Sequence, residues 1–238
     1  MQPAVLLVGA SSGIGEALAK QYAAAGWKVG VTGRREALLQ QLVQAYPEQI
    51  HAFAFDVCAD DALRHFQQAL ETLGHTQVIV YSSGVGELNQ QLLEDIEART
   101  VAVNVTAFTR IAIASYHYFE QNGGGQFAAI SSVASRRGER GSPAYNASKA
   151  YMSNYLEGLR KKAFRRKLPL FISDIRPGFV DTPMAKGPGL FWVAPVEKAA
   201  MQIKSAIDSK KEVAYITKRW ALVAWLIERM PSWLWKRL

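Results

Sequence analysis

Apolar runs alternate with segments of helical periodicity along most of the chain. The apolar runs are rich in strand-forming residues and lie at 4–9, 28–33, 51–57, 77–83, 125–132, 170–177 and 212–216. Several of them are apolar throughout, which is typical of parallel strands covered by helices on both faces. We therefore predict a parallel sheet of about seven strands.

The segments between these runs have the spacing of amphipathic helices. They lie at 15–26, 35–46, 60–74, 90–121, 143–165 and 195–209. Strands and helices that alternate in this way build sheets with helices on both faces. Because no repeat, linker or low-complexity tract interrupts the pattern, we predict one doubly wound α/β domain spanning 1–238.

Composition agrees with a globular domain in a reducing compartment. Of the 238 residues, 49% are hydrophobic and 20% are charged, which allows a sizeable core. Cys58 is the one cysteine and the histidines are scattered, so we expect no disulfide framework and no metal site. The first apolar run has no basic segment before it, which predicts a strand rather than a signal peptide. We expect no transmembrane helix and a cytoplasmic location.

The net charge of +8 is concentrated in two regions. One is "RKKAFRRK" (160–167), which contains no acidic residue, and the other is the segment 199–238. Such regions are either solvated helix faces or surfaces that attract an anionic membrane or substrate. Nucleic acid is disfavoured as a partner because no recognised binding motif accompanies the charge.

A glycine-rich turn, "GASSGIG" (9–15), follows the first predicted strand and precedes a helix. Glycines at 9, 13 and 15 permit a tight turn, close approach of the backbone to a phosphate and close helix packing. The helix N-terminus offers amide donors and a positive dipole end to a pyrophosphate. The alternative is a tight turn with a structural role alone. The position at the first strand–helix junction favours dinucleotide binding, with Gly9, Gly13 and Gly15 in the binding turn.

Two arginines follow the second predicted strand, in "TGRRE" (32–36). Dinucleotide folds specific for NAD usually have an acid here that binds the ribose 2′-hydroxyl, and Gly33 occupies that position. A guanidinium can instead bind a 2′-phosphate through paired, charge-assisted hydrogen bonds. Exposed arginines at a helix start are the alternative. We predict that NADP(H) is preferred over NAD(H), with Arg34 the stronger candidate and Arg35 the second.

Tyr145 and Lys149 stand four residues apart in "PAYNASKAYMSNY" (143–155), on one face of a predicted helix. Taken alone, this pair is either an ordinary helix surface or a phenol and an ammonium placed for proton transfer. Tyr151 and Tyr155 lie off that face or further along it, and we expect them to be packing residues.

Together, these motifs resemble the short-chain dehydrogenase/reductase family. Besides the glycine turn they comprise "DV" (56–57), "N" (104), "ISS" (130–132), "YNASK" (145–149) and "RPGFVDT" (176–182), in the family's order and spacing. The resemblance covers about residues 3–217. It implies a Rossmann-type fold and an oxidoreductase that transfers a hydride between a nicotinamide and a carbonyl carbon.

The resemblance implies four catalytic roles: Tyr145 as general acid/base, Lys149 as its electrostatic activator, Ser132 as the carbonyl-orienting hydroxyl, and Asn104 as the residue that positions a water near Lys149. The ordinary pKa of a phenol, about 10, is too high for proton exchange near neutrality. An ammonium about 4 Å away, at an effective dielectric of about 20, contributes about 4 kcal/mol, or about three pKa units. We therefore expect Lys149 to lower the pKa of Tyr145.

The resemblance also implies further cofactor contacts. Asp56 would bind the adenine amino group, and Thr182 would hold the nicotinamide carboxamide and the phosphates. The other cofactor-binding residues that it implies, besides the glycines, Tyr145 and Lys149, are Ser11, Ser12, Ile14, Val57, Gly84, Pro177, Gly178 and Val180. "YSSG" (81–84) replaces the family's "NNAG", and Val8 replaces its usual threonine. Because the first departure replaces the family's first asparagine, the stabilising role of that asparagine is not carried over to this chain. The assignment of the catalytic residues is unaffected.

The loop after Thr182 is short and glycine-rich, and its sequence does not identify the substrate. The predicted pocket residues are Val133, Ala134, Met184, Phe191 and Trp192, with Val85 and Leu190 beside them. They favour a lipophilic or acyl-type ketone. The alternatives are a 3-oxoacyl thioester, a lipid-linked sugar ketone or, from another class, a non-catalytic NADP(H)-binding sensor. The family resemblance implies a homodimer or homotetramer built through the helices that carry Asn104 and Tyr145.

The segment 218–238 lies outside the shared family pattern. Residues 220–227 would be apolar on every side of a helix, and Pro231 breaks that helix. Two tryptophans follow, beside Lys236 and Arg237. Tryptophans flanked by cations are typical of membrane interfaces. We therefore predict a basic, Trp-rich helical tail that covers the substrate pocket, forms a subunit interface or contacts a membrane peripherally.

Overall fold

The computed structural model describes residues 2–185 and 190–237, so residues 186–189 of the predicted substrate loop lie outside the described residues. The described chain forms a seven-stranded sheet in the order β3-β2-β1-β4-β5-β6-β7, and every neighbouring pair is parallel. The strands are β1 (Ala4–Val8), β2 (Lys28–Gly33), β3 (Ile50–Ala54), β4 (Val78–Tyr81), β5 (Gly125–Ile130), β6 (Leu170–Pro177) and β7 (Val213–Ile216). The predicted doubly wound parallel sheet is confirmed.

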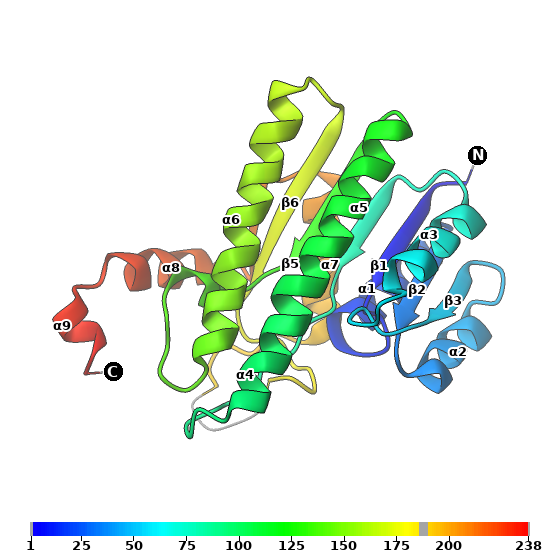
Figure 1. Cartoon of the computed structure of the whole chain (residues 1–238). Coiled ribbons are helices and arrows are strands. Elements are labelled where there is room, and N and C mark those ends of the chain that lie inside the picture. The colour runs from blue at the N-terminus through cyan, green and yellow to red at the C-terminus, as the bar shows by residue number, and fades with distance from the viewer. Residues whose placement is uncertain (1, 186–189, 238) are drawn as a thin grey trace.

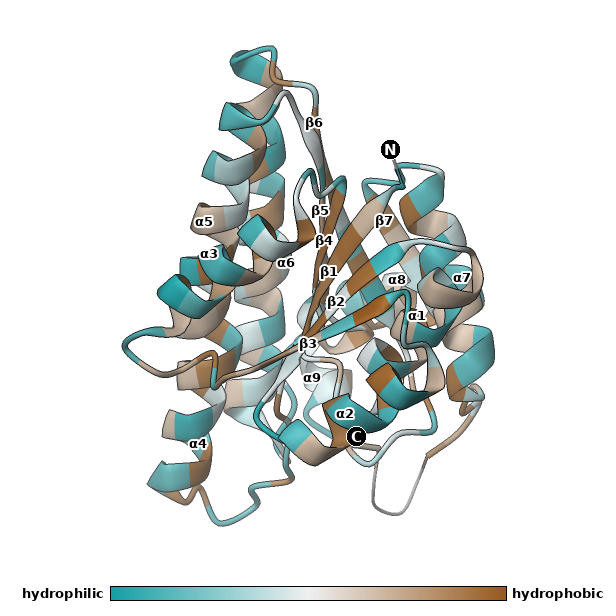
Figure 2. Cartoon of the chain, turned by 90° about the vertical axis from the view of Figure 1, so that its right-hand side faces the viewer, coloured by the Kyte–Doolittle hydropathy of each residue, from teal (hydrophilic) through white to brown (hydrophobic). Residues whose placement is uncertain are grey.

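Helices connect the strands and cover both faces of the sheet (Figures 1 and 2). The α-helices are α1 (Gly13–Ala24), α2 (Glu36–Ala45), α3 (Ala62–Leu73), α4 (Glu94–Val101), α5 (Phe108–Gln121), α6 (Pro143–Arg165), α7 (Val196–Asp208), α8 (Trp220–Arg229) and α9 (Ser232–Trp235). Two short elements are the π-helical turn η1 (Ala102–Ala107) and the 3₁₀ turn η2 (Val133–Arg136). Among the described residues, no helix combines the length and apolarity needed to cross a membrane.

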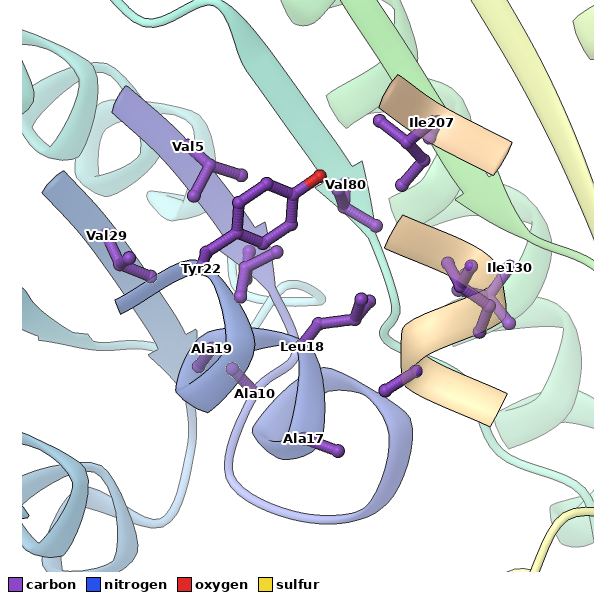
Figure 3. Close-up of a cluster of buried hydrophobic side chains, with 14 of the residues drawn as sticks. Val5, Ala10, Ala17, Leu18, Ala19, Tyr22, Val29, Val80, Ile130 and Ile207 are labelled. Atoms are coloured by element: carbon purple, nitrogen blue, oxygen red, sulfur yellow. The ribbon is translucent and has the colours of Figure 1, made fainter. Parts of the chain in front are cut away.

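The apolar core lies in two layers, one on each face of the sheet. On one face, Leu18 and Tyr22 of α1 and Ile207 of α7 pack on Val5 and Val80 of the sheet (Figure 3). On the other face, α3, α5 and α6 cover the strands, and buried aromatic residues such as Phe66 of α3 and Phe108 of α5 share this layer with Phe127 of β5. Because both faces are covered, the strands are apolar at nearly every position.

Successive strands are added on one side of β1 up to β3 and on its other side from β4 onward, as expected of a doubly wound fold. Ligands of such sheets bind outside the carboxyl ends of the strands at this point. The glycine turn follows β1, "SSG" (82–84) follows β4, and Ser132 follows β5. The topology therefore gathers the predicted motifs at one edge of the sheet.

Candidate active site

Ser132 and Tyr145 meet just beyond the carboxyl end of β5. The Ser132 hydroxyl accepts a hydrogen bond from the backbone N–H of Ala134 at 3.1 Å, and its side chain forms a hydrogen bond with Tyr145. Tyr145 lies in the first turn of α6, which begins at Pro143. Proline suits the first position of a helix, because the N–H that it lacks would have no hydrogen-bond acceptor within the helix there. The two hydroxyls are thus in place to contact one ligand atom together.

Lys149 lies one helical turn after Tyr145 and is almost fully buried. Its ammonium lies 5.7 Å from the centre of the Tyr145 ring and donates a hydrogen bond to the backbone oxygen of Ile130 at 2.9 Å. A Cβ placed on Gly84 would lie 3.4 Å from Lys149 Nζ, so the ammonium closely approaches the loop after β4. Lys149 therefore joins α6, β5 and this loop.

The ionisation of this pair differs from the sequence expectation in one respect. Burial raises the pKa of Tyr145, and the hydrogen bond with Ser132 opposes this rise. The expected lowering of the Tyr145 pKa is therefore wrong, because desolvation of the buried phenol is the largest influence on this pKa. Burial lowers the pKa of Lys149 to about 8, and the negative charge of Asp174 opposes that change. Near neutral pH the phenol is protonated and the ammonium is charged.

Asn104 lies in the π-helical turn between α4 and α5 and is fully buried. Its side chain accepts a hydrogen bond from the backbone N–H of Val85 at 3.0 Å and donates to the Val85 oxygen at 2.8 Å. It also donates to the Ser148 hydroxyl at 3.0 Å. Asn104 thus connects the loop after β4 with the helix of Tyr145 and Lys149, and its role in holding a water remains a prediction. Single π-turns inside α-helices are frequent at functional sites.

The glycine turn has the shape that a pyrophosphate requires. Gly9 has a φ of +93°, and a Cβ there would lie 2.4 Å from the Ser83 hydroxyl, so no other residue fits. Helix α1 starts at Gly13, and its first backbone N–H groups point out of the helix end. Thr182 packs against this turn, since a Cβ on Gly13 would lie 3.2 Å from Thr182 Cγ2. These residues fit the diphosphate of a dinucleotide.

The two arginines after β2 have different partners. Arg35 donates hydrogen bonds to the hydroxyls of Ser11, at 2.9 Å, and Ser12, at 2.6 Å, in the glycine turn. Arg34 forms an ion pair with Asp56 at 3.7 Å, across the carboxyl ends of β2 and β3. Both guanidinium groups are largely exposed and lie beside the position where the 2′ group of an adenine ribose is expected. The two guanidinium groups are suitable hydrogen-bond donors for a phosphate at that position.

The remaining predicted cofactor residues lie along the same edge. The Val57 side chain packs into the core. Ile14 packs against the core from α1. Pro177 ends β6 and its oxygen lies 3.5 Å from the Ser132 hydroxyl, while Val180 pairs with Ala194 in a parallel bridge.

The predicted substrate residues flank the catalytic pair on two loops. Val133 and Ala134 form the start of η2, directly after Ser132, and are half-buried. Met184 is exposed. Phe191 and Trp192 are about half exposed and form part of an aromatic cluster. The structure thus places Val133 and Ala134 directly after Ser132 and gathers Phe191 and Trp192 in the aromatic cluster. Met184 is exposed to about the same degree as these two rings.

Three residues of this region were not predicted from the sequence. A Cβ on Gly86 would lie 2.7 Å from the Tyr145 ring, so Gly86 is in direct contact with the phenol ring. Asp174 is fully buried in β6, pairs with Arg176 at 2.7 Å and accepts a hydrogen bond from Ser131. Trp220 packs on Gly178. An acidic and a basic residue two positions apart in a mostly apolar strand were the one available signal, since the other two contacts join distant parts of the chain.

Comparisons with known proteins agree with this geometry. The family model described as short chain dehydrogenase matches residues 3–189. An uncharacterized oxidoreductase of Myxococcus xanthus is 33% identical over 185 residues, which cover 75% of this chain and 72% of the relative.

Two solved structures share the fold along most of the chain. A short-chain dehydrogenase from Sphingobium yanoikuyae in complex with NADPH has a TM-score of 0.81 and 22% identity, and the match covers 97% of each chain. A short-chain dehydrogenase/reductase from Burkholderia phymatum in complex with NAD has a TM-score of 0.85 and 18% identity, covering 94% of this chain and 92% of the other. At these identities the likeness shows the fold, and the two cofactors differ.

Proposed function

The chain belongs to the short-chain dehydrogenase family of nicotinamide-dependent oxidoreductases, and we propose that it interconverts a carbonyl and an alcohol with NADP(H) in preference to NAD(H). The observation that carries the proposal is the convergence of Ser132, Tyr145 and Lys149, from two different elements, beside a glycine turn that fits a dinucleotide. Asn104 supports the group from the π-turn.

Each residue has a defined part in carbonyl reduction. A reduced nicotinamide, when bound, supplies the hydride that forms the new C–H bond. Tyr145 transfers its hydroxyl proton to the carbonyl oxygen as the C=O double bond becomes a single bond, and the product is the alcohol. Ser132 donates a hydrogen bond to that oxygen, and the charge of Lys149 stabilises the phenolate that Tyr145 leaves behind.

The ionisation states support reduction as the physiological direction. A proton donor must hold its proton at the working pH, and burial raises the pKa of Tyr145. Lys149 carries its charge near neutrality because its pKa is about 8. The pair therefore suits donation to a ketone.

A non-catalytic nucleotide sensor is the alternative from another class. A sensor needs the glycine turn but has no use for a phenol held between a serine hydroxyl and a buried ammonium. Burying Lys149 is also costly, since desolvation lowers its pKa to about 8 even though the charge of Asp174 opposes this change. The enzyme interpretation accounts for this cost, and the sensor interpretation does not.

Substitution of Tyr145 by phenylalanine tests the proposal. Tyr145→Phe removes the transferred proton and keeps the ring that packs on Gly86. We expect turnover to fall by about 10³-fold or more while NADPH affinity, measured by fluorescence titration, stays within about two-fold. Full turnover by Tyr145→Phe would refute the mechanism. A panel of ketones, 3-oxoacyl thioesters and lipid-linked sugars, followed by NADPH absorbance, identifies the substrate class.

The proposed assembly is a homodimer or homotetramer built through the helices of Asn104 and Tyr145. In support, α4, α5 and α6 expose four large apolar side chains, namely Val101, Ile113, Tyr151 and Phe164. Tyr155, in contrast, stacks on Tyr151 and packs against the core. Light scattering after size exclusion measures the mass, and a monomer at micromolar concentration contradicts this assembly.

We further propose a cytoplasmic protein whose tail, residues 218–238, contacts an anionic membrane surface peripherally. In α8, Trp225 is 49% exposed and the Arg229 guanidinium lies 4.7 Å from its ring centre. In α9, Trp233 is 63% exposed and Arg237 lies 5.7 Å from its ring centre. Exposed tryptophans with cations beside them suit the headgroup region of a bilayer. The net charge of +8 favours an anionic lipid surface over a second copy of this chain.

A further inference from the structure

The tail, whose helix α8 lies at one side of the molecule in Figure 1, has an inner face that contacts two loops next to Ser132. One of them, here called the serine loop, comprises residues 133–142 and joins Ser132 to the helix of Tyr145. Arg137 of this loop donates hydrogen bonds to the backbone oxygens of Ile227, at 2.9 Å, and Met230, at the carboxyl end of α8. Cations suit this end of a helix, where backbone oxygens have no helical partner.

Three more contacts fix the tail on the serine loop. Trp235 donates a hydrogen bond from its indole to the Gly138 oxygen at 3.0 Å, and the Arg137 guanidinium lies 5.0 Å from the Trp235 ring centre. Arg136 forms an ion pair with Glu228. The position of α8 is therefore fixed with respect to Ser132 by interactions at its carboxyl end.

The other end of α8 reaches the loop that follows β6. Trp220 is 3% exposed, and a Cβ on Gly178 would lie only 2.0 Å from its ring, so the indole lies directly on the Gly178 backbone. Arg219 donates a hydrogen bond to the Trp192 oxygen at 3.0 Å. Pro177, the residue before Gly178, has its oxygen 3.5 Å from the Ser132 hydroxyl. The indole of Trp220 thus lies one residue from the backbone that contacts Ser132.

Trp220 is the centre of an aromatic cluster rather than an ordinary core residue. Its ring centre lies 5.4 Å from that of Phe179, 5.1 Å from Phe191 and 6.1 Å from Trp192. Phe191 and Trp192 are 49% and 48% exposed, so the cluster is open to a ligand on that side. Within the part of the chain that the structure describes, the buried N–H of Trp220 has no hydrogen-bond acceptor, and buried tryptophans normally have one.

We infer that Trp220 determines substrate selectivity by holding the exposed rings of Phe191 and Trp192 in place as an apolar aromatic surface for the larger substituent of the carbonyl compound. This inference rests on the proposed function and deepens it, because it names the substrate class: ketones with an apolar, preferably aromatic, group rather than an anionic one. The tail contacts described above hold Trp220 at this position.

A matched pair of ketones tests the inference. 4-Phenyl-2-butanone and 4-oxopentanoate carry the same methyl ketone on the same two-carbon spacer, and they end in a phenyl group and a carboxylate. We expect the wild-type protein to prefer the phenyl ketone. In Trp220→Ala, kcat/KM for the phenyl ketone should fall about 10-fold, mainly through KM, while the value for 4-oxopentanoate changes less than about two-fold.

Two further variants separate selectivity from folding. Trp220→Phe keeps an aromatic ring on Gly178 and should retain most of the preference, so it serves if Trp220→Ala does not fold. Leu222→Ala lies on the same helix, at a side chain 62% exposed, and should leave the ratio unchanged. Equal losses for both ketones in Trp220→Ala would show a merely structural role and overturn the inference. A wild-type preference for 4-oxopentanoate would overturn it as well.

Binding measurements distinguish failure of this inference from failure of the proposed function. Calorimetry of 4-phenyl-2-butanone with the NADPH-saturated protein requires no turnover. Binding that Trp220→Ala weakens about 10-fold supports the apolar site even if no carbonyl compound is reduced, in which case only the proposed function fails. Absence of binding to the wild-type protein overturns the inference.

Discussion

At the scale of single residues, Gly86 constrains Tyr145, the proposed proton donor, although glycine has no side chain. Because a Cβ at this position would lie 2.7 Å from the Tyr145 ring, Gly86→Ala must displace the phenol. We expect kcat to fall about 10- to 100-fold, since misplacement by about 1 Å costs this much, while the melting temperature changes little. Gly158→Ala in α6 is the matched control, as a Cβ there meets nothing within 4 Å. Equal activity of both variants would contradict the prediction.

The two arginines after β2 allow a separate test of cofactor preference. Arg34 has a distant acidic partner, Asp56 at 3.7 Å, whereas Arg35 already donates to two serine hydroxyls. Arg34→Ala should lower the ratio of kcat/KM for NADPH over NADH about 10-fold or more, and Arg35→Ala should lower it less. Arg64→Ala, remote on α3, is the control. A ratio that Arg34→Ala leaves unchanged rules out the assignment.

Lys149 predicts the pH dependence of the reaction. Its pKa is about 8, so its charge is present below that pH and is lost above it. We expect kcat/KM for ketone reduction to fall as the pH rises above about 8. In the unfolded chain the ordinary value of 10.5 applies, so the unfolded state binds more protons in between, and the free energy of unfolding rises with pH from about 8 to 10.5. A rate that stays flat to pH 9.5 is incompatible with this role.

Sequence alone could identify the residues whose spacing is local, but not those whose contacts are tertiary. Tyr145 and Lys149 stand one helical turn apart, and the glycine turn is contiguous, so both could be found in the chain. Gly86 contacts Tyr145, about 60 positions away in the sequence, and Trp220 contacts Gly178, about 40 positions away. The sequence gives no local sign of either contact. The raised pKa of Tyr145 depends on burial, which no spacing reports.

At the scale of elements, β6 carries a buried ion pair beside the site. Asp174 is fully buried and pairs with Arg176, which also donates to the Tyr215 hydroxyl at 3.0 Å. Asp174→Asn leaves Arg176 without a countercharge, and we expect a loss of about 3–5 kcal/mol in the free energy of unfolding, measured by urea denaturation.

A double substitution is the control for this loss. Asp174→Leu with Arg176→Met replaces both charges by apolar groups, and the protein should unfold at a higher urea concentration than Asp174→Asn does. A single variant as stable as the wild-type protein would show that the pair contributes nothing.

The strands were predictable as elements because a strand buried on both faces must be apolar throughout. The helix predicted over 90–121 begins at Glu94, and the π-turn at Ala102–Ala107 was not predicted. Its backbone follows from the hydrogen bonds of Asn104 to Val85 and Ser148, which are tertiary contacts without a local signature.

At the scale of the whole molecule, membrane binding by the exposed Trp225 and Trp233 of the tail can be tested without disturbing the tail residues that contact the loops. Trp225→Ser with Trp233→Ser removes both exposed indoles and leaves Trp220 and Trp235 in place. We expect the wild-type protein to sediment with vesicles of anionic lipid, less so at high salt, and the double variant to lose this binding about 10-fold or more. Met201→Ser, exposed on α7, is the control. A wild-type protein that never sediments with anionic vesicles contradicts the proposal.

We propose that the sheet and the tail form one domain, since both ends of α8 contact loops of the sheet. This arrangement orders events during translation. The ribosome makes residues 220–235 after all seven described strands, so a nascent chain can complete its nucleotide site before Trp220 emerges. Until then the loops after Ser132 and Gly178 lack their common partner. On the proposed function, the nascent protein therefore completes its cofactor site first and the aromatic cluster around Trp220 last.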